Sequence, residues 1–373
     1  MGVTNSIQQM LCQEAAKRRK AITVNLELLP VCNLDCKMCY IRTDMEETKK
    51  QGGIKRKEEW LALAKELRAE GTLFLLLTGG EVFLYPEFRQ LYEELYRMGF
   101  IITINTNATL IDEKTVLWLS QLPPKCVSIS LYGISDDTYE SLCGKKGMFS
   151  RVDRAARLLL EKGIRIEFKM VQTPDNVHDT DKCYEYSQSL GVHFEASAYA
   201  FPAARKIDGK KQVRFSPVDA VYYKLMNRRR ETSLEGFLSG IYEHLNRFEE
   251  TREIPGGDVY GFTCGATNST CWITWKGHMT PCAMLETPYT LPFKDGFLAA
   301  WEELKIKCDR ILMSPKCSHC EKREVCTVCP AANYAEMGCF EKASTYHCQM
   351  TDLTLESMQR LVTEYQLKQN EKD

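Results

Sequence analysis

The feature that most constrains the fold of this chain is an alternation of short apolar runs and amphipathic segments between residues 22 and 198. Six of the runs have the length and content of β-strands, and the intervals between them carry apolar residues at helical spacing. The predicted strands are residues 22–29, 73–77, 101–105, 127–131, 164–170 and 192–198. This α/β pattern implies a parallel sheet, either open and doubly wound or a partial barrel, with active groups at the carboxyl ends of the strands.

The rest of the chain differs in composition from this repeating part. Breakers such as Pro202 and Pro255-Gly256-Gly257 surround a helical pattern at 217–247, so we expect a connector with its own helices. A loop-like part rich in Gly, Pro and Cys follows, and then a helix whose apolar face includes Met358 and Leu361 and should pack on the body. The predicted segments are 1–21 (N-terminal), 22–200 (barrel), 201–262 (connector), 263–350 (Cys-rich) and 351–373 (terminal helix).

The chain has 17 cysteines, and their context indicates metal binding rather than disulfides. No secretory signal precedes the first strand, the count is odd, and most cysteines fall into two groups. No stretch reaches the ~20 apolar residues of a membrane span, and the net charge of −1 provides no general attraction for nucleic acid or a membrane surface. We therefore expect a cytoplasmic protein.

Three cysteines, Cys32, Cys36 and Cys39, directly follow the first predicted strand. Three thiolates on such a loop can bind three irons of a four-iron, four-sulfur (4Fe-4S) cluster and leave the fourth iron open. Zinc is the alternative, but a closed zinc site takes four ligands and no fourth Cys or His is evident nearby.

The Cys-x3-Cys-x2-Cys spacing resembles the signature of the radical S-adenosylmethionine (SAM) superfamily, although Met38 stands where an aromatic residue is usual. The resemblance implies that the fold is a partial (β/α)6 TIM barrel. It also implies that SAM chelates the open iron of the cluster. In that family an electron from the cluster cleaves SAM to methionine and a 5'-deoxyadenosyl radical, which abstracts a substrate hydrogen.

Residues after the next three predicted strands resemble further SAM contacts of the family. Gly79-Gly80-Glu81 resembles the element that holds the SAM amino group, and Asn107 and Ser130 resemble polar positions that reach SAM. Three basic residues could each neutralise the SAM carboxylate, namely Arg151, Arg154 and Lys169. The sequence does not favour one of them over the others.

The second group of cysteines resembles the SPASM extension of radical SAM enzymes, which binds two auxiliary 4Fe-4S clusters, so the resemblance implies three clusters. It assigns Cys264, Cys271, Cys282 and Cys329 to the first auxiliary cluster. It assigns Cys317, Cys320, Cys326 and Cys348 to the second. Two zinc sites remain the alternative. The other cysteines are expected to be small buried residues, with Cys339 an alternative ligand: Cys12, Cys126, Cys143, Cys183, Cys308 and Cys339.

SPASM-type enzymes mostly modify peptides, so the resemblance predicts a peptide maturase that forms a thioether or carbon-carbon cross-link, or another modification, in a ribosomally made precursor. Ala283 stands where sulfatase-maturing relatives have Asp, which argues against formylglycine formation. A small-molecule dehydrogenase, sulfatase-maturase-like oxidation and a zinc-binding interaction module are the alternatives.

The expected partners follow from the predicted reaction. They are the precursor peptide and a low-potential electron donor such as flavodoxin or ferredoxin. Too few residues precede the first strand for a fused leader-recognition domain. We therefore expect a separate recognition protein, or a groove in the connector lined by Tyr199, Arg205 and Tyr260.

Overall fold

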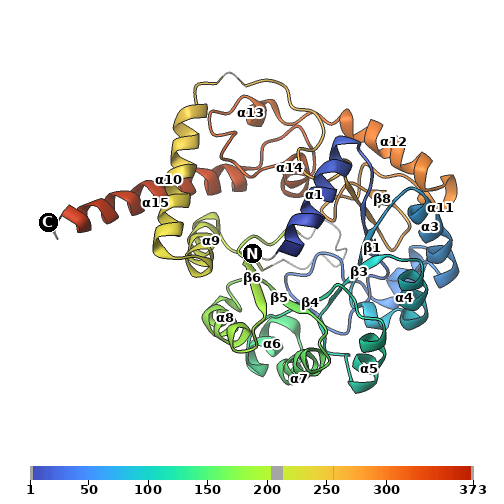
Figure 1. The fold of residues 1–373 in the computed structure, drawn as a ribbon. Helices are drawn as coiled ribbons and strands as arrows, with labels where there is room; N and C mark the ends of the chain where they lie inside the picture. The colour runs from blue at the N-terminus through green and yellow to red at the C-terminus, as the bar shows by residue number, and fades with distance from the viewer. Residues whose placement is uncertain (1–2, 203–212, 255, 371–373) are drawn as a thin grey trace.

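The computed structural model describes residues 3–202, 213–254 and 256–370. Its centre is an eight-stranded sheet in the order β6-β5-β4-β3-β2-β1-β7-β8 (Figure 1). Neighbouring strands are parallel throughout, except that β8 runs antiparallel to β7. Strands β1 to β6, with helices outside them, form the partial barrel of the predicted α/β class, which is thereby confirmed.

The six predicted strands are all present, and their ends lie within two residues of the expected positions. Their short apolar runs suit strands that are covered on both faces. The bounds are β1 Thr23–Glu27, β2 Phe74–Thr78, β3 Ile101–Thr106, β4 Cys126–Ser130, β5 Ile166–Val171 and β6 His193–Ser197, followed by β7 Thr270–Ile273 and β8 Met279–Thr280.

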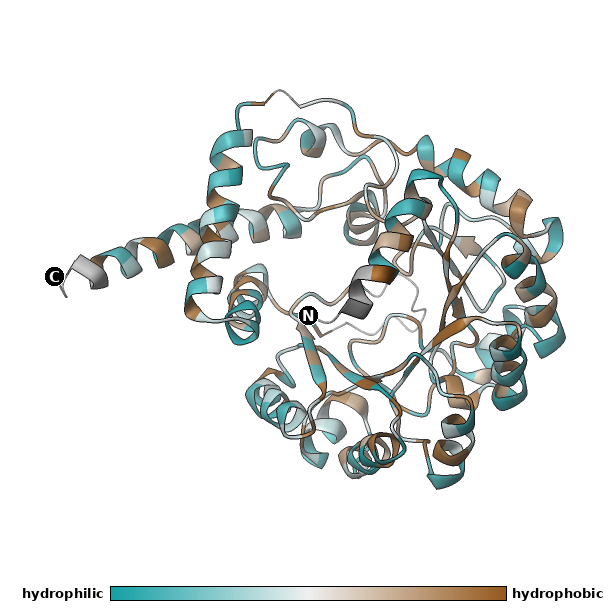
Figure 2. Ribbon diagram, viewed as in Figure 1, coloured by the Kyte–Doolittle hydropathy of each residue, from teal (hydrophilic) through white to brown (hydrophobic). Residues whose placement is uncertain are grey.

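The outer helices bury the apolar positions that the sequence spaced three and four residues apart. Leu63 and Leu67 of one helix and Leu91 and Leu95 of the next are buried in the main core. Figure 2 shows hydrophobic and hydrophilic residues on different sides of these helices. The helices are α2 Met45–Lys50, α3 Lys57–Ala69, α4 Phe88–Arg97, α5 Glu113–Gln121, α6 Asp136–Cys143, α7 Met148–Glu161 and α8 Thr180–Ser189, with 3-10 turns η1 Val82–Leu84 and η2 Val177–Asp179.

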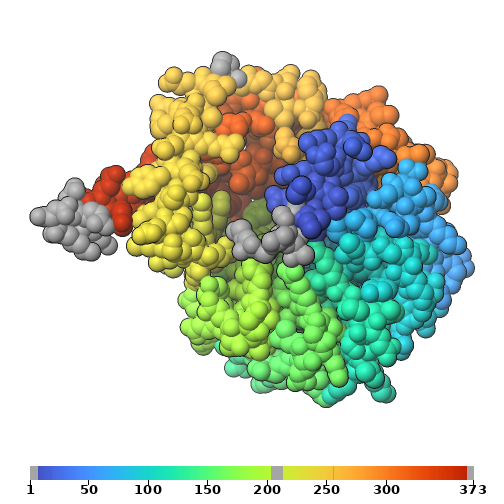
Figure 3. Space-filling view, viewed as in Figure 1, coloured from blue at the N-terminus to red at the C-terminus, as the bar shows by residue number. Residues whose placement is uncertain are grey.

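Helix α1, Val3–Lys17, lies at the amino ends of the barrel strands (blue in Figure 3). The Cys12 Sγ is 3.9 Å from the Thr23 Oγ1 at the start of β1. Lys125, one residue before β4, hydrogen-bonds Gln8. The carboxyl ends of the strands, where the cysteine loop begins, are therefore at the opposite end of the barrel from α1.

The connector forms two helices, α9 Pro217–Glu231 and α10 Leu234–Thr251, where the sequence indicated one helical region. The break comes at Thr232 and Ser233, because Ser233 Oγ caps α10 by accepting a hydrogen bond from Gly236 N at 3.1 Å.

The Cys-rich part contributes the β7–β8 hairpin to the barrel sheet, which the expectation of a loop-like segment missed. Strand β7 pairs in parallel with β1, with Thr270 beside Thr23 and Ile273 beside Leu26. Strands of four and two residues are too short to give a periodic signal. The remaining helices are α11 Pro292–Asp295, α12 Phe297–Asp309, α13 Pro315–Ser318, α14 Pro330–Met337 and α15 Thr345–Asn370.

The terminal helix α15 is longer than predicted and packs through the expected face. Met358 is 2% exposed and shares a core cluster with Leu225 of α9 and Ile241 of α10, and Leu361 packs against the same cluster. Among the described helices, none has the length and apolar content needed to cross a membrane.

Candidate functional site

Three cysteines and four of the five predicted cofactor residues line one cavity of about 340 Å³ at the carboxyl ends of the strands. A volume of this order is typical of a small-molecule site. The residues brought together are Cys32, Cys36, Cys39, Gly79, Gly80, Asn107 and Ser130.

The cysteine loop is held in place by helix α6. Asp35 N donates to Cys143 O at 2.9 Å, and Lys37 N donates to Leu142 O at 3.0 Å. The Cys143 thiol also hydrogen-bonds the thiol of Cys36. A cysteine about a hundred residues away along the chain therefore lies beside the loop, and no spacing pattern in the sequence indicated it.

The paired glycines bring the end of β2 against the backbone that enters the cysteine loop. Gly80 N donates to Leu29 O at 2.7 Å, and Glu81 N donates to Val31 O at 2.9 Å. A Cβ atom on Gly80 would lie 2.2 Å from Val31 O, and one on Gly79 would lie 2.5 Å from Leu29 O. Glycine is required here because two backbone segments meet more closely than a side chain allows.

Glu81, the fifth predicted cofactor residue, does not line the cavity. Its carboxylate is fully buried and accepts hydrogen bonds from Thr106 Oγ1 at 2.7 Å, Asn107 N at 2.8 Å and Phe83 N at 3.2 Å. Burial raises the pKa of this carboxyl, and the three donors oppose that rise. Glu81 thus joins the ends of β2 and β3, so that it positions Asn107 rather than contacting a ligand in the cavity.

The thiols of the loop are surrounded by hydrogen-bond donors. Leu34 N lies 3.4 Å and Asn107 Nδ2 3.6 Å from Cys32 Sγ, and Arg42 N lies 3.3 Å from Cys39 Sγ. Burial raises the pKa of the Cys32 thiol to about 12. Free thiols of this kind retain their protons at neutral pH, so binding of a metal centre here would release protons. Three thiol ligands, donors to sulfur and an adjoining cavity fit a cluster with SAM beside it.

Tyr132, which the sequence analysis left unassigned, also lines this cavity. Its hydroxyl hydrogen-bonds Ser130 and Cys36, and burial raises its pKa. Of the three basic residues considered for a carboxylate, only Lys169 lines the cavity. It pairs with Glu167 at 3.5 Å and Glu195 at 3.3 Å. Arg154 instead pairs with Glu113 on the surface, and Arg151 is exposed.

All four cysteines predicted for the second auxiliary cluster line a separate cavity of about 180 Å³: Cys317, Cys320, Cys326 and Cys348. Donors reach two of these sulfurs, since Thr351 Oγ1 is 3.1 Å from Cys326 Sγ and Asn333 Nδ2 is 3.7 Å from Cys317 Sγ. Cys339 does not line this cavity.

Three of the four cysteines predicted for the first auxiliary cluster lie together. Burial raises the pKa of the Cys282 thiol to about 12, and the neighbouring thiols of Cys329 and Cys264 raise it further. Cys271 is instead a fully buried residue of β7, paired with Val24 of β1, and burial raises the pKa of its thiol. The sheet therefore directs Cys271 into the core, which the sequence order of the cysteines did not reveal.

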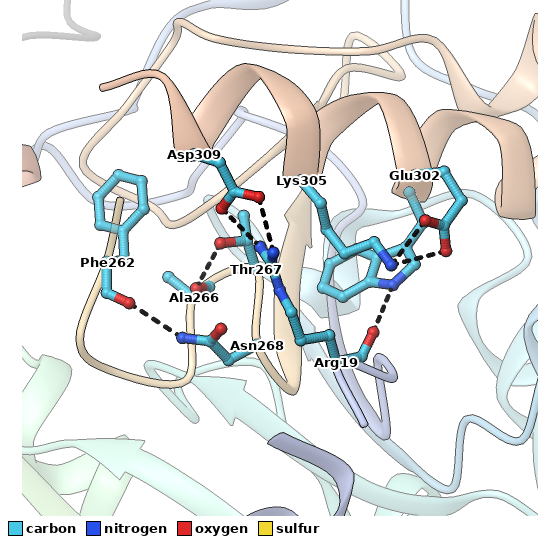
Figure 4. A network of polar contacts seen from close by, with 9 residues as sticks. Arg19, Phe262, Ala266, Thr267, Asn268, Glu302, Lys305 and Asp309 are labelled. Carbon is cyan, nitrogen blue, oxygen red and sulfur yellow. Dashed lines mark hydrogen bonds and ion pairs between the residues drawn. The ribbon is translucent and has the colours of Figure 1, made fainter. Parts of the chain in front are cut away.

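The loop that carries Cys264 is closed by its own polar contacts (Figure 4). Asn268 Nδ2 donates to Phe262 O at 3.0 Å, as Figure 4 shows. It also donates to Cys264 O at 2.7 Å. Near it, Arg19 binds Asp309 through two hydrogen bonds of 2.7 and 2.8 Å, which ties the chain before β1 to α12. A bidentate ion pair thus joins two distant parts of the chain near the Cys264 loop.

No group of three or more His, Cys, Asp and Glu side chains within the described residues is arranged around a single metal ion. A 4Fe-4S cluster differs from such a site, because each thiolate binds a different iron.

A larger cavity of about 880 Å³ adjoins the first one, and Glu195 and Ser197 of β6 line both. It extends from β6 past Tyr199 and α9 to Cys329 of the first auxiliary group. Of the residues predicted to form a groove in the connector, Tyr199 lines this cavity, Tyr260 does not and is 58% exposed, and Arg205 lies outside the described residues.

Comparison with known proteins gives one family match: residues 26–186 match the Radical SAM superfamily. The chain is 23% identical to the antilisterial bacteriocin subtilosin biosynthesis protein AlbA of Bacillus subtilis, over 86% of this chain and 68% of that protein. It is 22% identical to the AdoMet-dependent heme synthase of Methanosarcina barkeri, over 86% of this chain and 94% of that protein.

Solved structures share the fold. Streptococcus suis SuiB bound to its precursor peptide SuiA matches with a TM-score of 0.65 and 18% identity, over 94% of this chain and 82% of that chain. The fold of nearly the whole chain therefore also occurs in SuiB, a protein of similar length.

Proposed function

From the premise that residues 26–186 form a radical SAM domain, we propose that this chain is an enzyme that modifies a ribosomally made precursor peptide by abstracting a hydrogen atom from it. The observation that carries this proposal is the cavity in which Cys32, Cys36 and Cys39 face Gly80 and Asn107. Cys32, Cys36 and Cys39 would hold a 4Fe-4S cluster, which would supply the electron for reductive cleavage of SAM.

The chain's own residues hold and orient the reactants in this proposal. The glycine pair keeps the end of β2 against the cysteine loop, and Glu81 fixes Asn107 so that its amide faces Cys32. Ser130 and Tyr132 supply hydroxyl groups in the same cavity, and Lys169 is the cation available to a SAM carboxylate.

The Cys-rich part would hold the auxiliary clusters. The second set, Cys317, Cys320, Cys326 and Cys348, offers four thiolates around one cavity. The first set offers three, Cys264, Cys282 and Cys329, and Cys271 is not included because it lies in the core of the sheet. These clusters would accept the electron that a product radical gives up, and a flavodoxin or ferredoxin would reduce the first cluster.

Two relatives support a peptide as substrate. AlbA takes part in the biosynthesis of a bacteriocin, and SuiB binds the precursor peptide SuiA. The cavity of about 880 Å³ that adjoins the SAM cavity leads to Cys329, which gives a peptide side chain room between the site of hydrogen abstraction and an electron acceptor. The leader would be bound by a separate protein or by the connector.

A second candidate function is the oxidation of a small molecule, and the similarity to the heme synthase over 94% of that protein favours it. Both functions use the same SAM cavity and differ in the occupant of the larger cavity. Mass spectrometry of reactions with candidate precursor peptides and with iron porphyrins distinguishes them, because only the true substrate changes mass in step with SAM cleavage.

The decisive experiment measures 5'-deoxyadenosine after anaerobic reconstitution with iron and sulfide and reduction with dithionite in the presence of SAM. The native protein should release 5'-deoxyadenosine and contain roughly twelve irons per chain. Replacing Cys32, Cys36 and Cys39 by Ala should abolish release and remove roughly four irons. Cys12→Ala, in helix α1, is the matched control and should behave as the native protein. Release of 5'-deoxyadenosine by the triple variant would refute the proposal.

A further inference from the structure

Two cationic side chains and a histidine line one wall of the larger cavity. Lys224 and Arg228 are four residues apart on α9 and so share one face of it, and His244 of α10 lines the same cavity. We name Lys224 and Arg228 the cationic wall; His244 lies beside it.

The two cations of the wall are close enough to influence each other and the neighbouring His244. Burial lowers the pKa of His244, and Lys224, Arg228 and Arg247 lower it further. Burial likewise lowers the pKa of Lys224, and Arg228 adds to this effect. Cations that repel one another inside a protein destabilise the fold unless an anion joins them.

No carboxylate of the described residues neutralises this wall. Lys224 and Arg228 have no hydrogen bond or ion pair within that part of the chain. Two acidic residues line the same cavity, but Glu195 pairs with Lys169 at 3.3 Å, and Glu231 is the last residue of α9. The thiol of Cys326 also lies near Lys224.

The cationic side chains face the open space of the cavity. Lys224 and Arg228 are both exposed, and both line the cavity of about 880 Å³. Other parts of the lining are apolar, with Phe201, Met284 and Met350 among them. The cavity therefore combines apolar contact area with two cationic side chains that no carboxylate of the described residues pairs with.

We propose that the cationic wall binds a carboxylate of the peptide substrate, so that this enzyme selects a peptide with an acidic group next to the residue it modifies. The inference rests on the proposed function. The carboxylate comes from an Asp or Glu side chain or from the C-terminus of the peptide, and both offer the oxygen pair that Arg and Lys bind through charge-assisted hydrogen bonds.

The test is the affinity of reconstituted, SAM-loaded protein for three probe peptides, measured anaerobically by isothermal titration. The probes are acetyl-Leu-Glu-Leu-amide, its Gln counterpart, and acetyl-Leu-Gly-Leu with a free carboxylate. At least one carboxylate probe should bind about tenfold more tightly than the Gln probe, and the preferred probe identifies the source of the carboxylate.

Variants test whether the cationic wall causes the preference for carboxylate probes. Lys224→Gln with Arg228→Gln should remove it, whereas the matched pair Lys65→Gln with Lys182→Gln, two exposed lysines of α3 and α8, should keep it. Equal affinity of the native protein for all three probes overturns the proposal, whether or not the variants fold. If the native protein binds all three probes equally and the Lys224→Gln, Arg228→Gln variant has a changed electron paramagnetic resonance spectrum, the wall instead balances the charge of the second auxiliary cluster.

Release of 5'-deoxyadenosine by the same native preparation is measured in parallel. If no 5'-deoxyadenosine is released, the proposed function is refuted. A preference for the carboxylate probes would still show that the cavity binds a carboxylate.

Discussion

The side-chain amide of Asn107 lies 3.6 Å from the sulfur of Cys32, although 75 residues separate them in the chain. The same amide nitrogen donates to Asn33 Oδ1 at 2.9 Å, and the backbone N–H of Asn107 is held by Glu81. The end of β3 therefore positions a donor toward the first cysteine of the loop, and Glu81 of the neighbouring strand end holds that donor in place.

Asn107→Ala should weaken the SAM-binding cluster's function without unfolding the protein. Loss of a donor to sulfur should lower the reduction potential of the cluster, and the lost hydrogen bonds should slow 5'-deoxyadenosine release about tenfold. Spectroelectrochemical titration and product assays check this. Asn246→Ala on the exposed face of α10 is the control. An unchanged potential would show that the contact has no electronic effect.

Gly80→Ala should be destabilising, because its Cβ would lie 2.2 Å from Val31 O. Separation of the two backbones should cost about 1–3 kcal/mol of unfolding free energy and reduce iron retention in the first cluster. Urea denaturation and iron analysis measure both. Gly257→Ala has no atom within 4 Å of the added carbon and should change neither. A fully stable Gly80→Ala protein would mean that the close approach is not maintained in solution.

Glu81→Gln should alter how stability depends on pH. In the folded protein the pKa of Glu81 lies above its ordinary value of 4.5. At a pH between the ordinary pKa and the raised pKa, the folded protein therefore binds more protons than the unfolded chain. The stability that Glu81 contributes therefore falls as pH rises from 4.5 through the raised pKa. Chemical denaturation across this range should show the advantage of native protein over Glu81→Gln shrinking with pH. An advantage that grows with pH would contradict the assignment.

Cys271→Ala and Cys264→Ala should differ in iron content. Cys264 lies with Cys282 and Cys329, so its loss should remove roughly four irons. Cys271 is buried in β7, so its loss should leave iron unchanged and cost about 1 kcal/mol of stability. Iron analysis with thermal denaturation separates the two effects. Loss of iron from Cys271→Ala would restore the ligand set predicted from the sequence.

Cys348→Ala and Cys339→Ala test the second auxiliary site in the same way. Only Cys348 lines the cavity with Cys317, Cys320 and Cys326, so only its replacement should remove roughly four irons per chain. An equal loss in Cys339→Ala would mean that the region refolds around its metal.

Much of this protein could be predicted from local patterns. The six barrel strands were located within two residues because each buried strand is a short apolar run between breakers. The cysteine loop and the Gly79-Gly80 pair were recognisable because their chemistry depends on residue types at fixed short spacings.

Other features depend on contacts between distant segments, and only the tertiary structure decided them. The pairing of β7 with β1 buries Cys271, and α6 places Cys143 beside Cys36. The carboxylate of Glu81 is buried and hydrogen-bonded to Thr106 and Asn107. Spacing along the chain specifies which groups are available for chemistry, whereas long-range strand pairing and burial decide which of them meet, because those energies arise between residues that no local pattern connects.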